Sequence, residues 1–243
     1  MNTDPIPCLD HGFVRLVDVM GDDAAIVQAA RVSYNSGSKS PEEDAKLIRY
    51  LMKHRHTSPF EMVEFKFHVK MPIFVARQWH RHRTASINEV SGRYTEMKDE
   101  FFSPSFEEMR TQDKANKQAS GTDTIPDGDN ASLNMNVSMN LIFAEYQTNL
   151  RRGLSREMAR VILPLATYTE FYWKIDLHNL LHFLKLRMDS HAQPEIQVYG
   201  HALAKIVKDR VPIAYEAWYD HVLTAVTLTA AEYAALKSKG EAQ

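Results

Sequence analysis

The chain has 243 residues, with 29 Lys and Arg against 31 Asp and Glu, so its formal net charge is −2. A near-neutral balance without a long run of either sign argues against a general nucleic-acid-binding or membrane-surface protein. The length suits one compact domain, or one subunit of an oligomer. No segment has the roughly 18 consecutive apolar residues of a membrane helix, and the first residues carry no apolar run, so we expect neither a membrane span nor a signal peptide.

Cys8 is the only cysteine, which excludes internal disulfides and favours a reducing, cytoplasmic setting. Pro5 and Pro7 precede it in a polar N-terminal segment that we expect to be peripheral. Such a place offers nothing that would lower the pKa of the thiol, so Cys8 is a poor candidate for a catalytic thiolate.

The N-terminal part of the sequence predicts a strand followed by two helices. The strand is expected over residues 13–20, and Asp22 can cap a helix that runs to about residue 32. Residues 40–43 form a capping-box pattern with proline at the first helical position, which predicts a helix over residues 41–53.

The clearest strand spans residues 63–71, where apolar and polar residues alternate with a period of two, as in a strand with one buried face. Pro72 then ends the strand and begins a helix over residues 73–82. Residues 78–82 are therefore expected near the C-terminal end of that helix, and residues 89–94 in a loop.

Residues 111–130 are rich in Gln, Asp, Asn, Ser, Gly and Thr, and we expect them to form an exposed, mobile insertion. A long helix from about residue 132 should end at Gly153, after two arginines. An aromatic-rich strand is expected over residues 167–175. Shorter helices are predicted over residues 155–163, 177–188 and 194–209, with a weaker one after residue 214. Because strands and helices do not alternate regularly, the pattern favours an α+β single domain with a mostly antiparallel sheet, and it contains no glycine-rich dinucleotide fingerprint.

Residues 81–94 concentrate three arginines, a histidine, a glutamate and two serines directly after an apolar helical run. Guanidinium groups and turn amides are natural partners of phosphate oxygens, so this stretch predicts a site for a phosphorylated ligand. A solvated helix end would also place arginines here, but Glu89 and Ser91 interrupt the basic charge. The cluster alone is also compatible with a nucleotide- or nucleic-acid-binding module without chemistry, and with salt bridges between the subunits of an oligomer.

His178 and His182 lie four residues apart on one predicted helix, with Arg187 near its end. The histidines can be satisfied at the edge of the core, contact a cofactor, or bind zinc, although the zinc alternative lacks the glutamate of the metalloprotease motif and a third ligand. Arg187 follows an apolar run, and an unpaired buried charge is costly. It is therefore directed at something anionic, or it forms a structural salt bridge with Asp189 or Glu195.

Two further polar features each allow two interpretations. Arg156 and Arg160 share one helical face, where they either form a salt-bridged surface pair or reach toward a phosphate. Ser91 precedes a glycine, and a phosphate-binding turn is a better interpretation than a nucleophile because no histidine base is evident beside it.

Several blocks of the sequence resemble the flavin-dependent thymidylate synthases. The signature Arg-His-Arg, seven residues, Ser runs from Arg81 to Ser91, and it is accompanied in the correct order by similar blocks at residues 13–21, 29–33, 159–164 and 184–192. The resemblance implies methylation of dUMP to dTMP, with 5,10-methylenetetrahydrofolate as carbon donor, FAD as hydride carrier and NADPH as reductant. It also implies a homotetramer in which several subunits share each active site.

Carried over position by position, the resemblance implies FAD contacts by Ser58, Arg81, His82, Arg83, Glu89, Asp176, Leu177, His178 and His182. It implies dUMP contacts by Gln78, Trp79, His80, Arg81, Glu89, Val90, Ser91, Gly92, Arg93, Arg160 and Arg187, and no metal ligand.

Arg187 would be the catalytic residue in this pattern. It would face the uracil ring and favour its polarised form, and it would do so without help from a thiol because Cys8 is poorly placed. His56 would lie near the flavin edge. Two features depart from the family pattern: Asp176 stands where some relatives carry Asn, and the segment of residues 111–130 is longer than usual.

Overall fold

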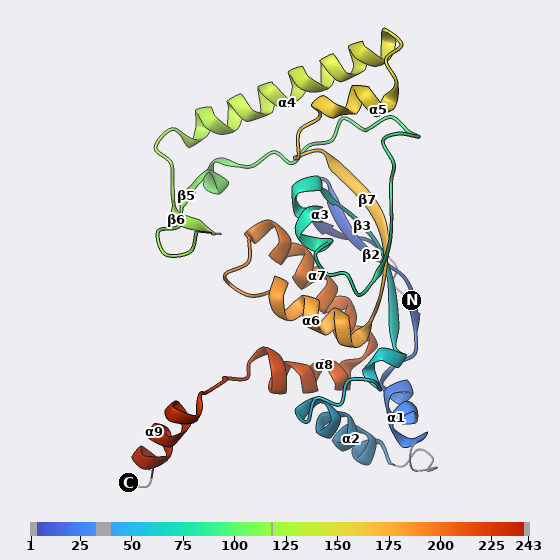
Figure 1. Cartoon of the computed structure of the whole chain (residues 1–243), viewed down its shortest axis with the longest axis vertical. Helices are drawn as coiled ribbons and strands as arrows, with labels where there is room; N and C mark the ends of the chain where they lie inside the picture. The colour runs from blue at the N-terminus through green and yellow to red at the C-terminus, as the bar shows by residue number, and fades with distance from the viewer. Residues whose placement is uncertain (1–3, 33–39, 118, 241–243) are drawn as a thin grey trace.

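The computed structural model describes residues 4–32, 40–117 and 119–240, and its central feature is a five-stranded sheet (Figure 1). The strands follow the order β1-β2-β3-β7-β4, and every neighbouring pair is antiparallel. Their bounds are β1 Ile6–Cys8, β2 Gly12–Met20, β3 Glu64–Pro72, β7 Tyr168–Asp176 and β4 Ser86–Glu89. The predicted α+β class with an antiparallel sheet is confirmed.

The two central strands, β3 and β7, each bury one face. Phe67 of β3 lies directly opposite Trp173 of β7, and neither side chain has exposed surface. Their neighbours two residues away along each strand are also buried and apolar, as a period of two requires. The strands predicted at residues 63–71 and 167–175 are thus confirmed to within a residue at each end.

Helices cover the buried face of the sheet and one of its ends (Figure 1). The helices on the buried face are α3 Ile73–Trp79, α6 Leu177–Arg187 and α7 Pro194–Arg210, and those gathered at the end are α1 Asp23–Arg31, α2 Pro41–Lys53 and α8 Pro212–Trp218. Asp22 accepts two backbone N–H bonds at the start of α1, and Ser40 and Glu43 form the predicted capping box of α2. A π-helical turn, Tyr219–Leu223, follows α8, and α9, Ala230–Gly240, lies apart from the body (Figure 1).

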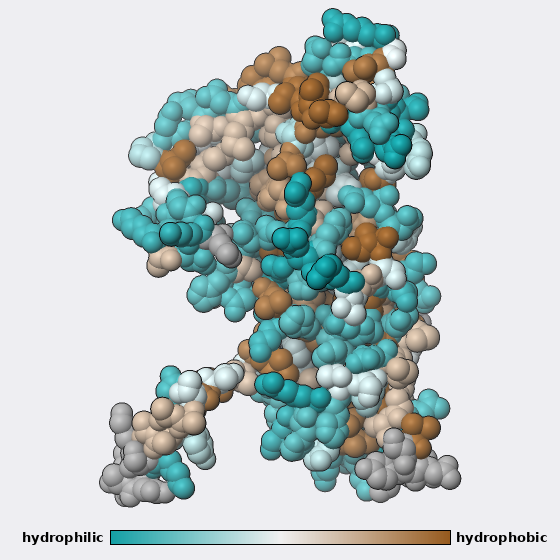
Figure 2. All heavy atoms as spheres, viewed as in Figure 1, coloured by the Kyte–Doolittle hydropathy of each residue, from teal (hydrophilic) through white to brown (hydrophobic). Residues whose placement is uncertain are grey.

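An arm lies beyond the other end of the sheet. It consists of α4, Gly128–Arg151, α5, Arg156–Ala159, and the 3-10 turn Arg160–Ile162, and it has a small hydrophobic core of its own. Several apolar side chains of the arm nevertheless face solvent, such as Leu141 at 67% and Val161 at 70% exposure, and Figure 2 shows hydrophobic atoms gathered on this part of the surface. Exposed apolar patches of this kind are typical of interaction surfaces.

The structure corrects three expectations. Residues 86–89 form the edge strand β4, so Glu89 belongs to a strand and not to a loop. The long helix α4 begins at Gly128 instead of near residue 132, and within the mostly exposed segment of residues 111–130 the strand β5, Arg110–Gln112, pairs with β6, Ser120–Thr124. Backbone pairing accounts for this hairpin, because its side chains are mostly polar and exposed.

Cys8 is the third correction, because it is not peripheral. Its side chain is only 1% exposed, since β1 pairs with β2 and joins the main hydrophobic core. Among the described residues, no helix is both long enough and apolar enough to cross a bilayer.

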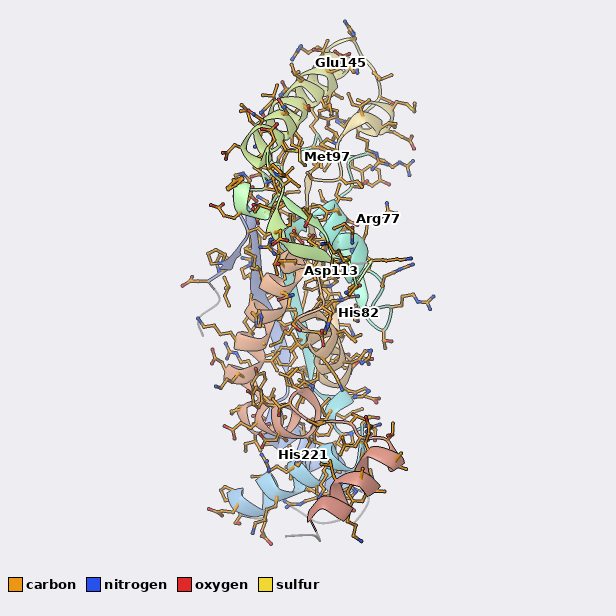
Figure 3. The ribbon with its side chains drawn as sticks, turned by 90° about the vertical axis from the view of Figure 1, so that its left-hand side faces the viewer. Arg77, His82, Met97, Asp113, Glu145 and His221 are labelled. Atoms are coloured by element: carbon orange, nitrogen blue, oxygen red, sulfur yellow. The ribbon has the colours of Figure 1, made fainter. Side chains whose placement is uncertain are left out.

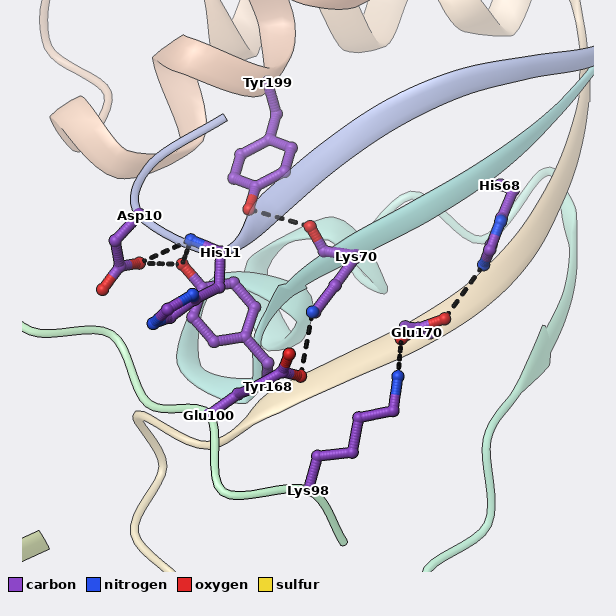
Figure 4. Close-up of polar contacts among 9 residues, drawn as sticks. All are labelled: Asp10, His11, His68, Lys70, Lys98, Glu100, Tyr168, Glu170 and Tyr199. Carbon is purple, nitrogen blue, oxygen red and sulfur yellow. Dashed lines mark hydrogen bonds and ion pairs between the residues drawn. The ribbon is translucent and has the colours of Figure 1, made fainter. Parts of the chain in front are cut away.

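Polar contacts attach the segment that follows β4 to the sheet (Figure 4). The contacts are Lys98 Nζ to Glu170 Oε1 at 3.0 Å, Lys70 Nζ to Glu100 Oε2 at 2.8 Å, and the backbone N–H of Ser103 to Asp10 Oδ2 at 2.9 Å. The hydroxyl of Tyr168 also donates to Asp10. Burial and this hydrogen bond raise the pKa of Tyr168, so it remains a neutral donor. The path of residues 98–103 across the sheet is therefore fixed.

Candidate active site

The arginine-rich stretch connects the end of α3 to β4. α3 ends at Trp79, residues 80–85 turn, and β4 then pairs with β7. Arg81 and Arg83 are exposed on this turn, and neither forms a salt bridge within the described part of the chain. Both guanidinium groups are therefore free to bind an anionic ligand.

Arg187 contacts the same stretch from the end of α6. Its Nε donates to His82 Nε2 at 3.0 Å and its Nη2 donates to the backbone oxygen of Gln78 at 3.3 Å. Neither predicted salt bridge of Arg187 is formed, and Asp189 instead pairs with His191 at 2.8 Å. The Arg187 guanidinium at the junction of α3 and α6 has no acidic partner among the described residues, so its positive charge can pair with an anionic group of a ligand.

His82 is suited to accept this hydrogen bond because it is neutral. Burial lowers the pKa of His82 to about 4, and the positive charges of Arg187 and His182 act in the same direction. With Nε2 accepting from Arg187, the ring proton resides on Nδ1. Figure 3 shows His82 midway along the molecule, between Met97 and His221.

A pocket of about 570 Å³ opens between β4, the loop after it and the arm, and we call it the strand pocket. Its lining includes four residues of the predicted nucleotide site: Glu89, Val90, Gly92 and Arg160. Arg160 comes from the arm, about 70 residues along the chain from the others, and forms no salt bridge among the described residues. The fold thus joins the signature to a distant arginine.

The Ser91–Gly92 pair forms the predicted turn. Ser91 Oγ accepts from the backbone N–H of Arg93 at 3.3 Å, and no imidazole contacts that hydroxyl among the described residues. A Cβ on Gly92 would lie 2.9 Å from Met97 Sδ and 3.1 Å from Arg160 Cδ, so any larger residue here would push these two side chains back from the turn. The geometry favours a binding turn over a serine nucleophile.

The remaining arginines of this region fasten the loop to the arm. Arg93 lies 3.4 Å from Glu157, and Arg156 lies 3.9 Å from Glu96. The two arginines of the α5 region therefore have different surroundings: Arg156 makes a surface ion pair, whereas Arg160 lines the strand pocket.

A second pocket, of about 380 Å³, lies between the end of α2, α6 and the segment after α8, and we call it the helix pocket. Its basic lining residues are Lys53, Arg55, His56, His178, His182, Lys185 and His221, and no carboxylate lines it among the described residues. Leu51, Leu181 and Trp218 contribute apolar surface. Basic and apolar walls together suit a ligand with a flat ring and phosphates.

His178 and His182 both line the helix pocket, and the ring of His182 lies 6.2 Å from that of His82. The described residues contain no group of three or more potential metal ligands. Asp176 caps α6: one of its oxygens accepts from the backbone N–H of Asn179 at 2.9 Å and the other from the Asn179 side chain at 2.7 Å. Helix capping alone therefore accounts for an acidic residue at position 176, with no need for a contact to a ligand.

Two predicted contact residues have side chains that no ligand can reach. Trp79 and Leu177 are both 0% exposed, and Trp79 packs in the core against Trp173 and Phe183. The structure gives these side chains a packing role, so only their backbones could contact a ligand. Buried polar atoms of Gln78, Trp79 and His80 have no hydrogen-bond partner among the described residues, which is unusual unless a ligand completes the site. Ser58 is exposed in the turn before the 3-10 helix Phe60–Met62.

Sequence reasoning missed several residues that line the two pockets. Thr169 lies inside the strand β7 and lines the strand pocket, while Lys185 and His221 line the helix pocket. The sequence offered one signal for Thr169, since it is a polar residue in the same alternating row as the apolar Phe171, Trp173 and Ile175. The sequence offered no signal for His221, because the π-helical turn Tyr219–Leu223 determines which way its side chain points.

The chain is similar to several known proteins. A family model described as thymidylate synthase complementing protein matches residues 15–213. The chain is 59% identical over 232 residues to a flavin-dependent thymidylate synthase of Thermus thermophilus, covering 96% of this chain and 84% of that one. It is 53% identical over 222 residues to that of Wolbachia pipientis wMel, covering 91% and 78%. A solved structure of the UMP/dUMP methylase PolB from Streptomyces cacaoi, bound with 5-Br dUMP, is 34% identical with a TM-score of 0.80 and covers 88% of this chain and 97% of that chain. The chain therefore belongs to the flavin-dependent thymidylate synthase family.

Proposed function

We propose that this protein methylates dUMP to dTMP, with 5,10-methylenetetrahydrofolate as carbon donor, FAD as hydride carrier and NADPH as reductant. The observation that carries the proposal is the strand pocket, where Glu89, Val90 and Gly92 of the signature meet Arg160 of the arm. Turn amides and a fixed guanidinium suit a phosphate, and a carboxylate suits hydroxyl and N–H donors. A nucleoside monophosphate offers all of these groups. The named function of the curated relatives supports the same reaction.

The proposed dUMP contacts combine both walls of the strand pocket with the end of α3. They are Gln78, His80, Arg81, Glu89, Val90, Ser91, Gly92, Arg93, Arg160 and Arg187. Arg187 is the proposed catalytic residue, because a guanidinium beside the uracil ring favours the ionised or polarised form of the ring, whose added electron density makes C5 a better nucleophile. His82 directs that guanidinium through the 3.0 Å hydrogen bond.

The helix pocket is the proposed site for FAD, which supplies hydride transfer to the one-carbon unit when it is bound. Seven basic side chains and no carboxylate among the described lining residues suit its pyrophosphate, and the apolar wall suits its ring. The proposed FAD contacts are Ser58, Arg81, His82, Arg83, Glu89, His178 and His182. Asp176 is a weaker candidate, since both of its oxygens already bond Asn179.

The reaction proposed here does not use a cysteine. Burial raises the pKa of the Cys8 thiol to about 12, so the thiolate is scarce at neutral pH. Cys8 also belongs to the main core at β1 and lines neither pocket. Polarisation by Arg187 is therefore the proposed route to a reactive uracil C5, in place of thiolate addition at C6.

We further propose that the whole chain forms one catalytic domain of a cytoplasmic homotetramer with shared active sites. The exposed apolar side chains of the arm, including Leu133, Leu141 and Val161, support burial against other subunits. Light scattering should then give about four times the chain mass of 27.9 kDa. A stable, fully active monomer would contradict shared sites.

The test of the reaction is direct. Purified protein supplied with dUMP, methylenetetrahydrofolate, FAD and NADPH should form dTMP, measured by chromatography, and omission of dUMP, methylenetetrahydrofolate or NADPH should stop it. The alternative, a non-catalytic nucleotide- or nucleic-acid-binding module built on residues 81–93, predicts bound nucleotide without product and a protein without flavin absorbance.

A further inference from the structure

We infer that Thr169 is a positioning residue, which fixes the carboxylate of Glu89 so that one of its oxygens faces the bound nucleotide. The inference rests on the proposed function of the strand pocket, whose wall includes both residues. Thr169 lies outside the signature at residues 81–94, on the neighbouring strand β7.

The pairing of β4 with β7 brings the two side chains together. Glu89 lies directly opposite Phe171, so both side chains emerge on the same face of the sheet. Thr169 is two residues before Phe171 and therefore shares that face, as the diagonal neighbour of Glu89. Its hydroxyl donates to Glu89 Oε1 at 2.6 Å. The contact is thus built into the register of the sheet.

Burial gives this hydrogen bond its directing effect. Thr169 is only 3% exposed, whereas Glu89 is exposed at the end of an edge strand. A buried hydroxyl has one proton, and Thr169 commits it to Glu89, whose charge strengthens the bond. An exposed glutamate would otherwise sample several rotamers. With Oε1 engaged, Oε2 remains as the acceptor for a hydroxyl or N–H of the nucleotide.

The same bond also affects the charges of the pocket. Glu89 and Arg160 line one cavity, and Arg160 forms no salt bridge among the described residues. A carboxylate released from Thr169 would be attracted to this cation, and it would then compete with the phosphate of the nucleotide. Thr169 therefore keeps opposite charges apart until the substrate binds.

The chain contains a matched control two residues away. Thr167 is 0% exposed, and its hydroxyl donates to the backbone oxygen of Pro164 at 2.7 Å, outside the lining of the strand pocket. Thr167→Val and Thr169→Val remove the same group from the same segment. Only the second change removes a bond to Glu89.

The experiment measures the dissociation constant of dUMP by calorimetry and steady-state turnover, with flavin content and thermal stability recorded for each variant. Thr169→Val should weaken dUMP binding about tenfold and raise KM for dUMP by a similar factor, with a smaller change in kcat. Thr169→Ser should restore binding to within about threefold, because the hydroxyl returns. Thr167→Val should bind dUMP as the wild type does, even where its thermal stability is lower.

A double-mutant cycle with Glu89→Ala makes the inference specific. Once Glu89 is absent, Thr169→Val should have no further effect on dUMP binding. The inference is overturned if the two effects multiply in full, if Thr169→Val binds dUMP normally, or if Thr167→Val weakens binding equally. If Thr169→Val does not fold, Thr169→Ala can replace it in the wild type and in Glu89→Ala, and the same comparison of dUMP binding tests whether the two residues act together. A wild type that forms no dTMP refutes the proposed reaction, while the dUMP binding cycle still decides the role of Thr169.

Discussion

Arg187→Lys tests whether the direction of the Arg187 charge matters beyond its presence. In the wild type, Nε donates to His82 at 3.0 Å and Nη2 donates to the backbone oxygen of Gln78 at 3.3 Å. Lysine keeps the charge but cannot reproduce this planar fork. The first bond joins a charged donor to a neutral acceptor and the second is long, so their joint loss should cost about 2 kcal/mol. This corresponds to roughly a thirtyfold lower kcat/KM.

The assay is dTMP formation as a function of dUMP, with the other substrates saturating. Arg187→Ala, which also removes the charge, should lose most activity while it keeps the fold. Arg152→Lys is the control, because Arg152 pairs with Glu145 on the exposed end of α4. Wild-type turnover of Arg187→Lys would show that charge alone suffices, and the directing role of His82 would then be wrong.

Three further predictions follow from the site. The pKa of His82 is lowered to about 4 from its usual 6.5, so between these pH values the unfolded chain binds a proton that the folded chain excludes. The contribution of neutral His82 to the free energy of unfolding is therefore complete above pH 6.5 and is lost as the pH falls toward 4. Urea unfolding should show a shallower dependence of stability on acid for His82→Asn than for the wild type. Cys8→Ala should form dTMP at close to the wild-type rate and with lower thermal stability, and an inactive variant that still binds FAD and dUMP would identify Cys8 as the nucleophile. Ser91→Ala should weaken dUMP binding yet retain turnover at saturating dUMP, and complete inactivity there would revive the nucleophile interpretation.

The sequence predicted correctly those parts of the fold that depend on residues close together in the chain, such as alternating strands and helix caps. β3 alternates apolar and polar residues, and all of its apolar residues are buried; among the polar ones only Lys70 is buried, where it pairs with Glu100. The caps at Asp22 and Ser40 are satisfied by residues two to three positions away. Neither feature depends on the rest of the chain.

The missed features depend on distant partners. β4 has four exposed residues and no alternation, so only its pairing with β7 makes it a strand. The contact between Arg187 and His82 joins positions 105 residues apart. Cys8 is buried because β2 pairs with its strand β1, a partner that the short, proline-containing N-terminal segment does not itself indicate. The signature located the candidate site, but the partners of its side chains came from β7, α6 and the arm.

The placement of the signature on an edge strand has a consequence for stability. β4 pairs with β7 on one side only, and Arg81 and Arg83 precede it without salt bridges in the described part of the chain. A short exposed edge beside unneutralised cations is weakly held, because few buried contacts oppose its loss of conformational freedom. An anionic ligand that binds there stabilises the folded state in proportion to its affinity. The residues that bind the ligand are therefore the ones whose order depends on it, and binding completes the edge of the sheet as well as the active site.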